Sequence, residues 1–151
     1  YVGDDDFVLV NGDNLYSLSD LKTLRGRDDR LNYVAGIAVN NPEIYGSLVS
    51  DHNGLLLRID EKVPEPISNL VNTGGFKFTK DLFAVADQIQ PNPKSGEYYL
   101  TDAVTLLAQD KKVKVHQMKD YWLDFGKPED IPAVEQFIQE NDLFEQYGII
   151  R

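Results

Sequence analysis

The first forty residues place the tightest limit on the fold, because two apolar strands enclose one helix. The run Phe7–Val10 is rich in β-branched and aromatic residues without alternation, which is typical of a strand covered on both faces. A helix capped by Ser17 or Ser19 follows, and residues 33–39 form a second buried strand. A strand–helix–strand unit of this kind implies a right-handed crossover in a parallel sheet.

The rest of the chain predicts a hairpin and a further alternation of strands and helices. Runs at 45–49 and 55–59 flank Asp51-His52-Asn53-Gly54, and Asn-Gly is a strong turn dipeptide. Strands are expected at 70–78, 113–116 and 121–125, and helices after Thr79, at 100–108 and from Pro128. This order predicts a single α/β domain with a mixed sheet, and the length of 151 residues suits one domain.

The composition excludes several classes of function. Fifteen basic and 25 acidic residues give a net charge of −10, which disfavours binding to nucleic acid or anionic lipid by charge. The chain has no cysteine, and His52 and His116 are too far apart for a short metal motif. No apolar run approaches the roughly 18–20 residues that span a bilayer, and no signal peptide opens the chain. We therefore expect a cytoplasmic protein without a membrane partner.

Two aspartates stand at the ends of expected strands. Asp13 follows the first strand at its carboxyl edge, where open α/β sheets bind ligands. Asp124 closes the run Trp122–Asp124 shortly before a glycine. Two carboxylates that reach one crevice suit Mg²⁺, which takes oxygen ligands. An aspartate in a turn after a strand is also an ordinary structural residue, so the spacing alone leaves both interpretations open.

A series of short motifs follows in a fixed order. The motifs are Val10-Asn11-Gly12-Asp13-Asn14, Tyr45-Gly46, Glu61-Lys62, Asn72-Thr73-Gly74, Gly96-Glu97 with Leu100-Thr101-Asp102, and Trp122-Leu123-Asp124-Phe125-Gly126 with Pro128-Glu129-Asp130. Each is weak alone, but together they resemble the sugar-phosphate nucleotidylyltransferase family, the nucleotide-sugar pyrophosphorylases. The resemblance runs from about Phe7 to Ile131 and implies a Rossmann-like, GT-A-type nucleotidyltransferase fold with a mixed, mainly parallel sheet.

The resemblance also implies roles for individual residues. Asp13 and Asp124 would bind Mg²⁺ and, together with Lys62, form the catalytic set, with Lys62 placed as a point charge on the sugar phosphate. The substrate-binding residues would be Asn14, Tyr45, Gly46, Glu61, Asn72, Thr73, Gly74 and Trp122. The attacking oxygen of a sugar-1-phosphate is already anionic, so this chemistry needs no histidine base. His52 and His116 are accordingly interpreted as structural, solvated residues.

The sequence departs from the family in its phosphate-binding parts. The glycine-rich G-x-G-T-R stretch and its downstream lysine, which hold the nucleotide triphosphate, are absent, and in the family they precede the first strand found here. With Met118 as the sole methionine, this implies that residues 1–151 are the C-terminal, sugar-phosphate and metal-binding portion of a catalytic domain in a longer protein. Ser95 replaces a frequent arginine, and Lys94 is a candidate for supplying that charge.

The pair Glu61-Lys62 raises a geometric difficulty. Adjacent residues in a regular strand point to opposite faces, so both reach one pocket only if the strand breaks there. The prolines Pro64 and Pro66 favour such a break.

The predicted reaction joins a nucleoside triphosphate to a sugar-1-phosphate, with glucose-1-phosphate and UTP or dTTP as the default pair, and releases pyrophosphate. We expect no turnover from the chain alone, and an open sheet edge leaves a homo-oligomer as one outcome. One alternative is a non-catalytic sugar-nucleotide-binding or regulatory module. Another is a metal-dependent GT-A glycosyltransferase that uses Asp4-Asp5-Asp6 as its metal motif. The tail at 144–151 is either a link to a further domain or a frayed end.

Overall fold

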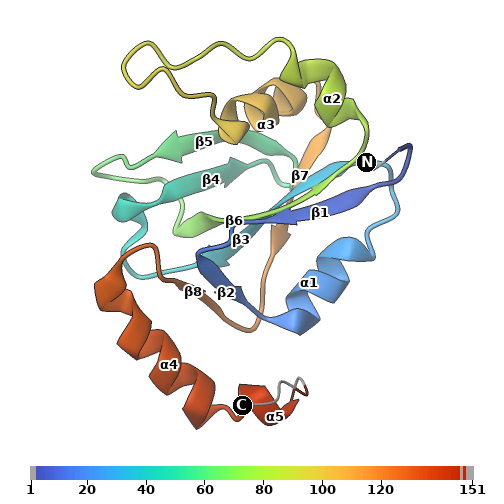
Figure 1. Cartoon of the computed structure of the whole chain (residues 1–151). Coiled ribbons are helices and arrows are strands. Elements are labelled where there is room, and N and C mark those ends of the chain that lie inside the picture. The colour runs from blue at the N-terminus through green and yellow to red at the C-terminus, as the bar shows by residue number, and fades with distance from the viewer. Residues whose placement is uncertain (1–2, 147, 149–151) are drawn as a thin grey trace.

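Short strands and helices alternate along the chain in the computed structural model, which describes residues 3–146 and 148 (Figure 1). The strands are β1 Phe7–Val10, β2 Asn14–Tyr16, β3 Asn32–Ala38, β4 Gly46–Ser50, β5 Leu56–Glu61, β6 Leu70–Phe78, β7 Val113–Gln117 and β8 Trp122–Asp124. The helices are α1 Leu18–Arg25, α2 Asp81–Ala86, α3 Leu100–Gln109, α4 Ile131–Glu140 and α5 Leu143–Gln146, with 3-10 turns η1 Pro42–Ile44 and η2 Pro128–Asp130. The tail considered above lies partly outside the described residues.

The large sheet has the strand order β5-β4-β6-β3-β7, and β1 pairs with β6 as well. Both β1 and β3 run antiparallel to β6, so they are parallel to each other, as expected, but β6 lies between them. Among the described residues, β3 and β7 form the one parallel ladder of this sheet. The mixed α/β class is confirmed. The sheet was expected to be mainly parallel, but it is mainly antiparallel. The reason is that β6 and the β4–β5 hairpin insert antiparallel neighbours.

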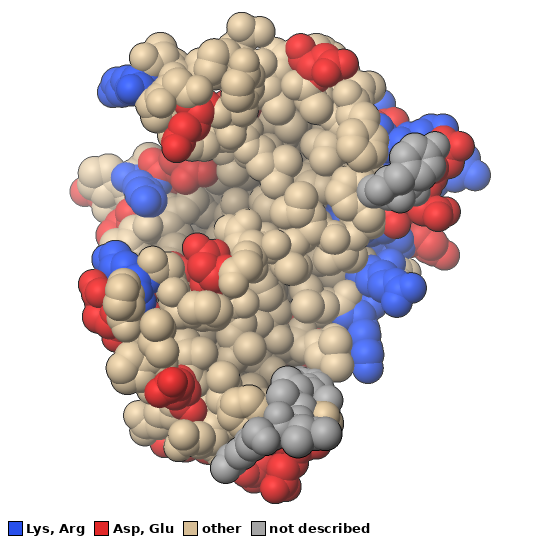
Figure 2. Space-filling view, viewed as in Figure 1, with Lys and Arg blue, Asp and Glu red and all other residues tan. Residues whose placement is uncertain are grey.

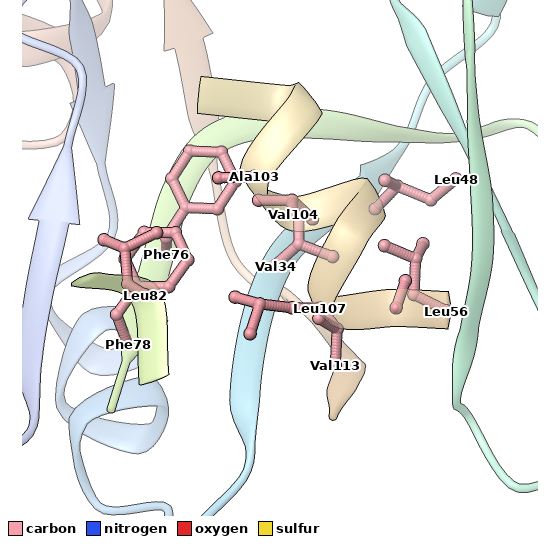
Figure 3. Packing of buried hydrophobic residues seen from close by; sticks show 11 residues of the cluster. Val34, Leu48, Leu56, Phe76, Phe78, Leu82, Ala103, Val104, Leu107 and Val113 are labelled. Carbon is pink, nitrogen blue, oxygen red and sulfur yellow. The ribbon is translucent and has the colours of Figure 1, made fainter. Parts of the chain in front are cut away.

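The helices divide between the two faces of the sheet. On one face, α2 and α3 cover the larger core (Figure 3), whose buried residues are Val34, Leu48, Leu56, Phe76, Phe78, Leu82, Ala103, Val104, Leu107, Ala108 and Val113. On the other face, α1 and the small β2–β8 sheet cover a second core of Tyr16, Leu24, Tyr33, Ala35 and Met118. Full burial of one such apolar side chain contributes roughly 1.5–3 kcal/mol, so both layers hold the sheet in place.

Local signals place the turns and caps as expected. Ser17, rather than Ser19, caps α1, because its hydroxyl accepts a hydrogen bond from the Asp20 N–H at 3.3 Å. The Thr79 hydroxyl accepts from the Asp81 N–H at 3.2 Å just before α2, although the N-cap position itself is Lys80. The β4–β5 hairpin turns at Gly54, whose φ of 76° lies in the region that favours glycine.

The small sheet was not foreseen from the sequence. The segment after β1 contains only turn formers until Asn14, yet β2 pairs antiparallel with β8, with Asn14 opposite Asp124 and Tyr16 opposite Trp122. The Phe125 N–H donates to the Asp13 carbonyl at 3.0 Å and extends this pairing. The two aspartates are therefore brought together by backbone hydrogen bonds. None of the helices described in this structure has the length and apolar composition needed to cross a bilayer.

Candidate functional site

An open cleft of about 830 Å³ lies where the ends of β5 and β8 meet the middle of β6. Every residue to which the resemblance assigns a role lines it. The lining residues are Asn11, Asp13, Asn14, Glu43, Ile44, Tyr45, Gly46, Glu61, Lys62, Asn72, Thr73, Gly74, Trp122, Asp124, Gly126, Lys127 and Asp130. The fold thus assembles residues from five separated segments into one concave surface, which is typical of a small-molecule site.

Asp13 and Asp124 face a common space beside Gly126. A methyl group on Gly126 would lie 3.6 Å from Oδ2 of Asp13 and 3.5 Å from Oδ1 of Asp124. Both side chains are exposed, and neither forms an ion pair with another described residue. The two carboxylates are therefore adjacent, open to the cleft and without a cationic partner.

This donor set suits Mg²⁺. The described residues contain no cluster of three or more His, Cys, Asp and Glu side chains that would enclose a metal by themselves. Mg²⁺ is commonly bound through one or two carboxylates, with water and substrate phosphates as the remaining ligands. A pair of oxygen donors at the rim of an open cleft therefore fits an ion that is shared with a phosphorylated substrate.

Lys62 reaches the cleft because β5 ends at Glu61. The backbone of Lys62 is left-handed, with a φ of 48°, and its N–H donates to the Tyr45 carbonyl at 3.0 Å. This turn resolves the difficulty of two adjacent residues in one pocket, and it occurs at Lys62 itself, before Pro64. Glu61 pairs with Gly46 across the hairpin, and a Cβ on Gly46 would lie 3.0 Å from both Glu61 carboxylate oxygens. Glycine therefore leaves room for that carboxylate.

The segment Asn72-Thr73-Gly74 is a bulge in β6. Between the pairs Val34–Phe76 and Gly36–Asn72, residues 73–75 stand opposite Ala35 alone. Gly74 has a φ of 72°, and a Cβ there would lie 2.3 Å from the Asn11 amide nitrogen. The Thr73 hydroxyl donates to the Ala35 carbonyl at 3.0 Å, so this side chain fixes the bulge.

Aromatic rings form one wall of the cleft. The rings of Tyr45 and Trp122 meet edge to face with centroids 5.3 Å apart. Burial raises the pKa of Tyr45, and the carboxylates of Asp124 and Asp130 add to this effect. Burial also raises the pKa of Tyr16 to about 12, with Asp13 and Asp124 contributing. Both phenols therefore stay neutral near neutral pH, beside a cleft rich in carboxylates.

Comparison with known proteins identifies the family. Residues 1–141 match the model of the nucleotidyl transferase family. The chain belongs to this family.

Several relatives of this nucleotidyl transferase chain are longer proteins. It is 37% identical over 146 residues to the bifunctional sugar-1-phosphate nucleotidylyltransferase/acetyltransferase of Sulfurisphaera tokodaii, covering 94% of this chain and 35% of the relative. It is 36% identical over 143 residues to the UTP–glucose-1-phosphate uridylyltransferase AglF of Haloferax volcanii, covering 91% and 58%. The chain thus spans between about a third and three fifths of the length of these curated relatives.

The fold of the nucleotidyl transferase chain is also found among solved structures. The crystal structure of UDP-glucose pyrophosphorylase complexed with UDP-glucose superposes with a TM-score of 0.76 at 24% identity, covering 92% of this chain and 58% of that one. A glucose-1-phosphate thymidylyltransferase structure from Bacillus anthracis gives a TM-score of 0.71 at 22% identity, covering 90% and 55%. These likenesses confirm the expected Rossmann-like nucleotidyltransferase fold.

Some lining residues of this nucleotidyl transferase cleft escaped the sequence interpretation. Glu43 and Ile44 belong to η1, for which no pattern gave a signal. Asp130 belongs to the last motif and Lys127 lies between the two parts of that motif, but no role was assigned to either residue. The Lys127 N–H donates to the Asp130 carboxylate at 3.2 Å, and Lys127 forms no ion pair within the described part of the chain.

Other candidates lie elsewhere. Lys94 does not line the cleft, so it does not replace the missing arginine there. His116 is structural but not solvated as predicted: it is 3% exposed, and its Nδ1 lies 3.2 Å from the Arg27 guanidinium. Burial lowers its pKa, and the charge of Arg27 lowers it further. Asp4 and Asp6 form ion pairs with Lys80 and Lys77 and are absent from the cleft lining.

Proposed function

We propose that this chain is the sugar-phosphate and metal-binding part of a sugar-1-phosphate nucleotidylyltransferase. The observation that carries the proposal is the single cleft, which gathers two open carboxylates, a lysine and hydroxyl-binding groups from distant segments. The reaction joins a nucleoside triphosphate to a sugar-1-phosphate and releases pyrophosphate. Glucose-1-phosphate with UTP or dTTP is the proposed pair, and the 36% identity with the UTP–glucose-1-phosphate uridylyltransferase AglF supports the UTP choice.

The proposed step needs positioning and charge more than acid–base catalysis. An anionic phosphate oxygen of the sugar-1-phosphate attacks the α-phosphorus of the triphosphate. The bond from that phosphorus to the oxygen bridging the β-phosphate breaks, and the electron pair leaves with pyrophosphate. Lys62, which lines the same cleft as the aspartates, holds the attacking phosphate as a point charge. No proton has to be removed from the nucleophile, which agrees with a cleft that has no histidine in its lining.

Asp13 and Asp124 are the proposed ligands of Mg²⁺. When bound, this ion supplies positive charge that offsets the charge on the reacting phosphates. The two aspartates share the space beside Gly126, and this geometry leaves the cleft side of the pair open to substrate.

The sugar would lie against the other lining residues of the cleft. Glu61, which pairs with Gly46, presents a carboxylate that can accept hydrogen bonds from two adjacent sugar hydroxyls. Tyr45 and Trp122 offer apolar ring surface, and the bulge at Asn72-Thr73-Gly74 allows close approach of its backbone. Gly46 and Gly74 therefore act through space and backbone. The Asn72 side chain accepts from the Gly74 N–H at 2.9 Å, and Glu61 provides directed hydrogen bonds.

Binding of glucose-1-phosphate to the chain in the presence of Mg²⁺, followed by NMR, tests this proposal. K62A is expected to weaken binding roughly tenfold to a hundredfold, because a charge-assisted contact to the phosphate is lost. K94A removes a lysine charge outside the cleft and should leave the binding of glucose-1-phosphate unchanged. Equal binding by K62A and the unchanged chain would contradict the assignment of Lys62.

A turnover assay tests whether the chain catalyses the reaction by itself. The sequence contains no G-x-G-T-R stretch, so the chain alone is expected to release no pyrophosphate from UTP and glucose-1-phosphate. Release by the isolated 151 residues would contradict this. The glycosyltransferase alternative loses its support, because Asp4 and Asp6 are engaged by lysines and do not line the cleft.

A further inference from the structure

The side-chain amide of Asn14 contacts one oxygen of Asp13. Its Nδ2 donates to Oδ1 of Asp13 at 2.8 Å. Asn14 is itself fixed in β2, where it pairs with Asp124 of β8. The donor therefore sits on the small sheet that carries both aspartates, and its position relative to them is set by backbone pairing.

The second oxygen of Asp13 is the one that faces the shared space. Oδ2 lies 3.6 Å from the position of a Gly126 Cβ, and Oδ1 of Asp124 lies 3.5 Å from the same point. Because Asn14 holds Oδ1, rotation of the carboxyl group that would exchange the two oxygens breaks a hydrogen bond. A half-turn would present an equivalent oxygen, so the amide fixes the plane of the carboxylate and keeps its other oxygen in the space beside Gly126.

One donor of the Asn14 amide is engaged and its acceptor is enclosed. One of the two N–H groups of Nδ2 donates to Asp13, and Oδ1 is enclosed and has no hydrogen-bond partner among the described residues. The reverse orientation of the amide would place that oxygen against a carboxylate oxygen, which is repulsive. The geometry favours an action of Asn14 on Asp13 over direct contact with a sugar.

We propose that Asn14 is a positioning residue, which holds Oδ1 of Asp13 so that Oδ2 is oriented toward a divalent cation shared with Asp124. The inference rests on the proposed function, since it takes the two aspartates as cation ligands. Removal of a group that hydrogen-bonds to a metal ligand and orients it typically lowers metal affinity about tenfold to a hundredfold.

A titration of the 151-residue chain with MnCl₂ tests this inference, with free Mn²⁺ measured by electron paramagnetic resonance. N14A is expected to raise the dissociation constant about tenfold, and N14L, which keeps the bulk of the side chain, should do the same. N53A is the matched control: the Asn53 amide also contacts the residue before it, His52, but lies in the exposed β4–β5 turn. N53A should bind Mn²⁺ like the unchanged chain.

The outcomes separate this inference from the proposed function. D13N should abolish binding, and the side-chain amide resonance of Asn14 should shift in that variant. Normal binding by N14A or N14L, with binding lost in D13N, would overturn the role of Asn14 alone. Weak binding by N14A but normal binding by N14L would assign the effect to packing and also overturn it. Undiminished binding by D13N, or no binding by the unchanged chain, would overturn the cation assignment itself.

Discussion

Strand β1 has carboxylates at both ends, and the two groups differ in their surroundings. At the start, Asp6 contacts the Lys77 ammonium, which is 2% exposed, and Asp4 contacts the exposed Lys80. The hydrogen bond and charge of Lys80 lower the pKa of Asp4. At the other end, Asp13 has no cationic partner within the described chain and faces Asp124.

We infer that this difference separates acids that stabilise the fold from the acids proposed to bind a cation. At the start of β1, the aspartates that stabilise the fold are already paired with lysines. A pair of acids left facing each other raises the energy of the empty site, and a bound cation relieves that repulsion. The lysines show the same division, since Lys77 is buried and paired whereas Lys62 is exposed and projects from a left-handed turn. In Figure 2 several Lys and Arg side chains lie along the edge beside α1 and the N-terminal segment.

The largest expected effect compares the two ends of β1 directly. D6N leaves the buried Lys77 charge without its partner and should lower the free energy of unfolding by about 2 kcal/mol, less than for a fully buried pair because Asp6 is 39% exposed. D13N removes repulsion with Asp124 and should not lower the free energy of unfolding. Urea unfolding at neutral pH with EDTA measures this free energy for both variants. An equal decrease in D6N and D13N would contradict the proposed difference between the two ends of β1.

A substitution at Gly126 tests whether a cation binds in the space shared by Asp13 and Asp124. G126A adds a methyl group at ordinary contact distance from the two facing carboxylate oxygens, so the chain should fold normally. The methyl group nevertheless occupies the shared space, and Mn²⁺ affinity should fall roughly tenfold. G12A is the control, since a Cβ there has no neighbour within 4 Å. Normal Mn²⁺ affinity in G126A would place the cation elsewhere.

The smallest effect concerns Tyr16, an ionisable group kept neutral by burial. Its hydroxyl donates to the Thr73 carbonyl at 2.7 Å, and Y16F should cost about 1 kcal/mol at neutral pH. The folded pKa is raised from 10.0 to about 12, so the unfolded chain loses the proton first and stability falls between pH 10 and 12. Urea midpoints across this range should show a shallower decline in Y16F. An unchanged slope would contradict this, and the raised pKa of Tyr33 accounts for a remaining decline.

Elements with a complete local pattern were predictable from the sequence. The spacing of Ala103, Val104, Leu107 and Ala108 predicts the buried face of α3, and Asn53-Gly54 predicts the hairpin. Both follow from periodicity or turn chemistry within a few residues. The motif order likewise predicted which residues line the cleft.

The remaining features depend on distant contacts. β2 is too short to show a period, and its partner β8 lies far along the chain. The left-handed turn at Lys62 carries no glycine, and only the Tyr45 carbonyl across the hairpin explains it. His116 alternates with lysines like a solvated residue, yet α1 and the following loop cover it with Arg27. Sequence patterns do not report such tertiary pairings.

The bulge in β6 also bears on how the cleft could adapt to different sugars. Asn72-Thr73-Gly74 is inset in a strand whose other residues, such as Phe76 and Phe78, pack into the larger core. That wall cannot shift without opening ladders on both sides of β6, whereas segments 62–69 and 125–127 lie outside the described strands. Changes in sugar preference should therefore arise through substitutions in these two loops, with the β6 wall serving as a fixed reference surface.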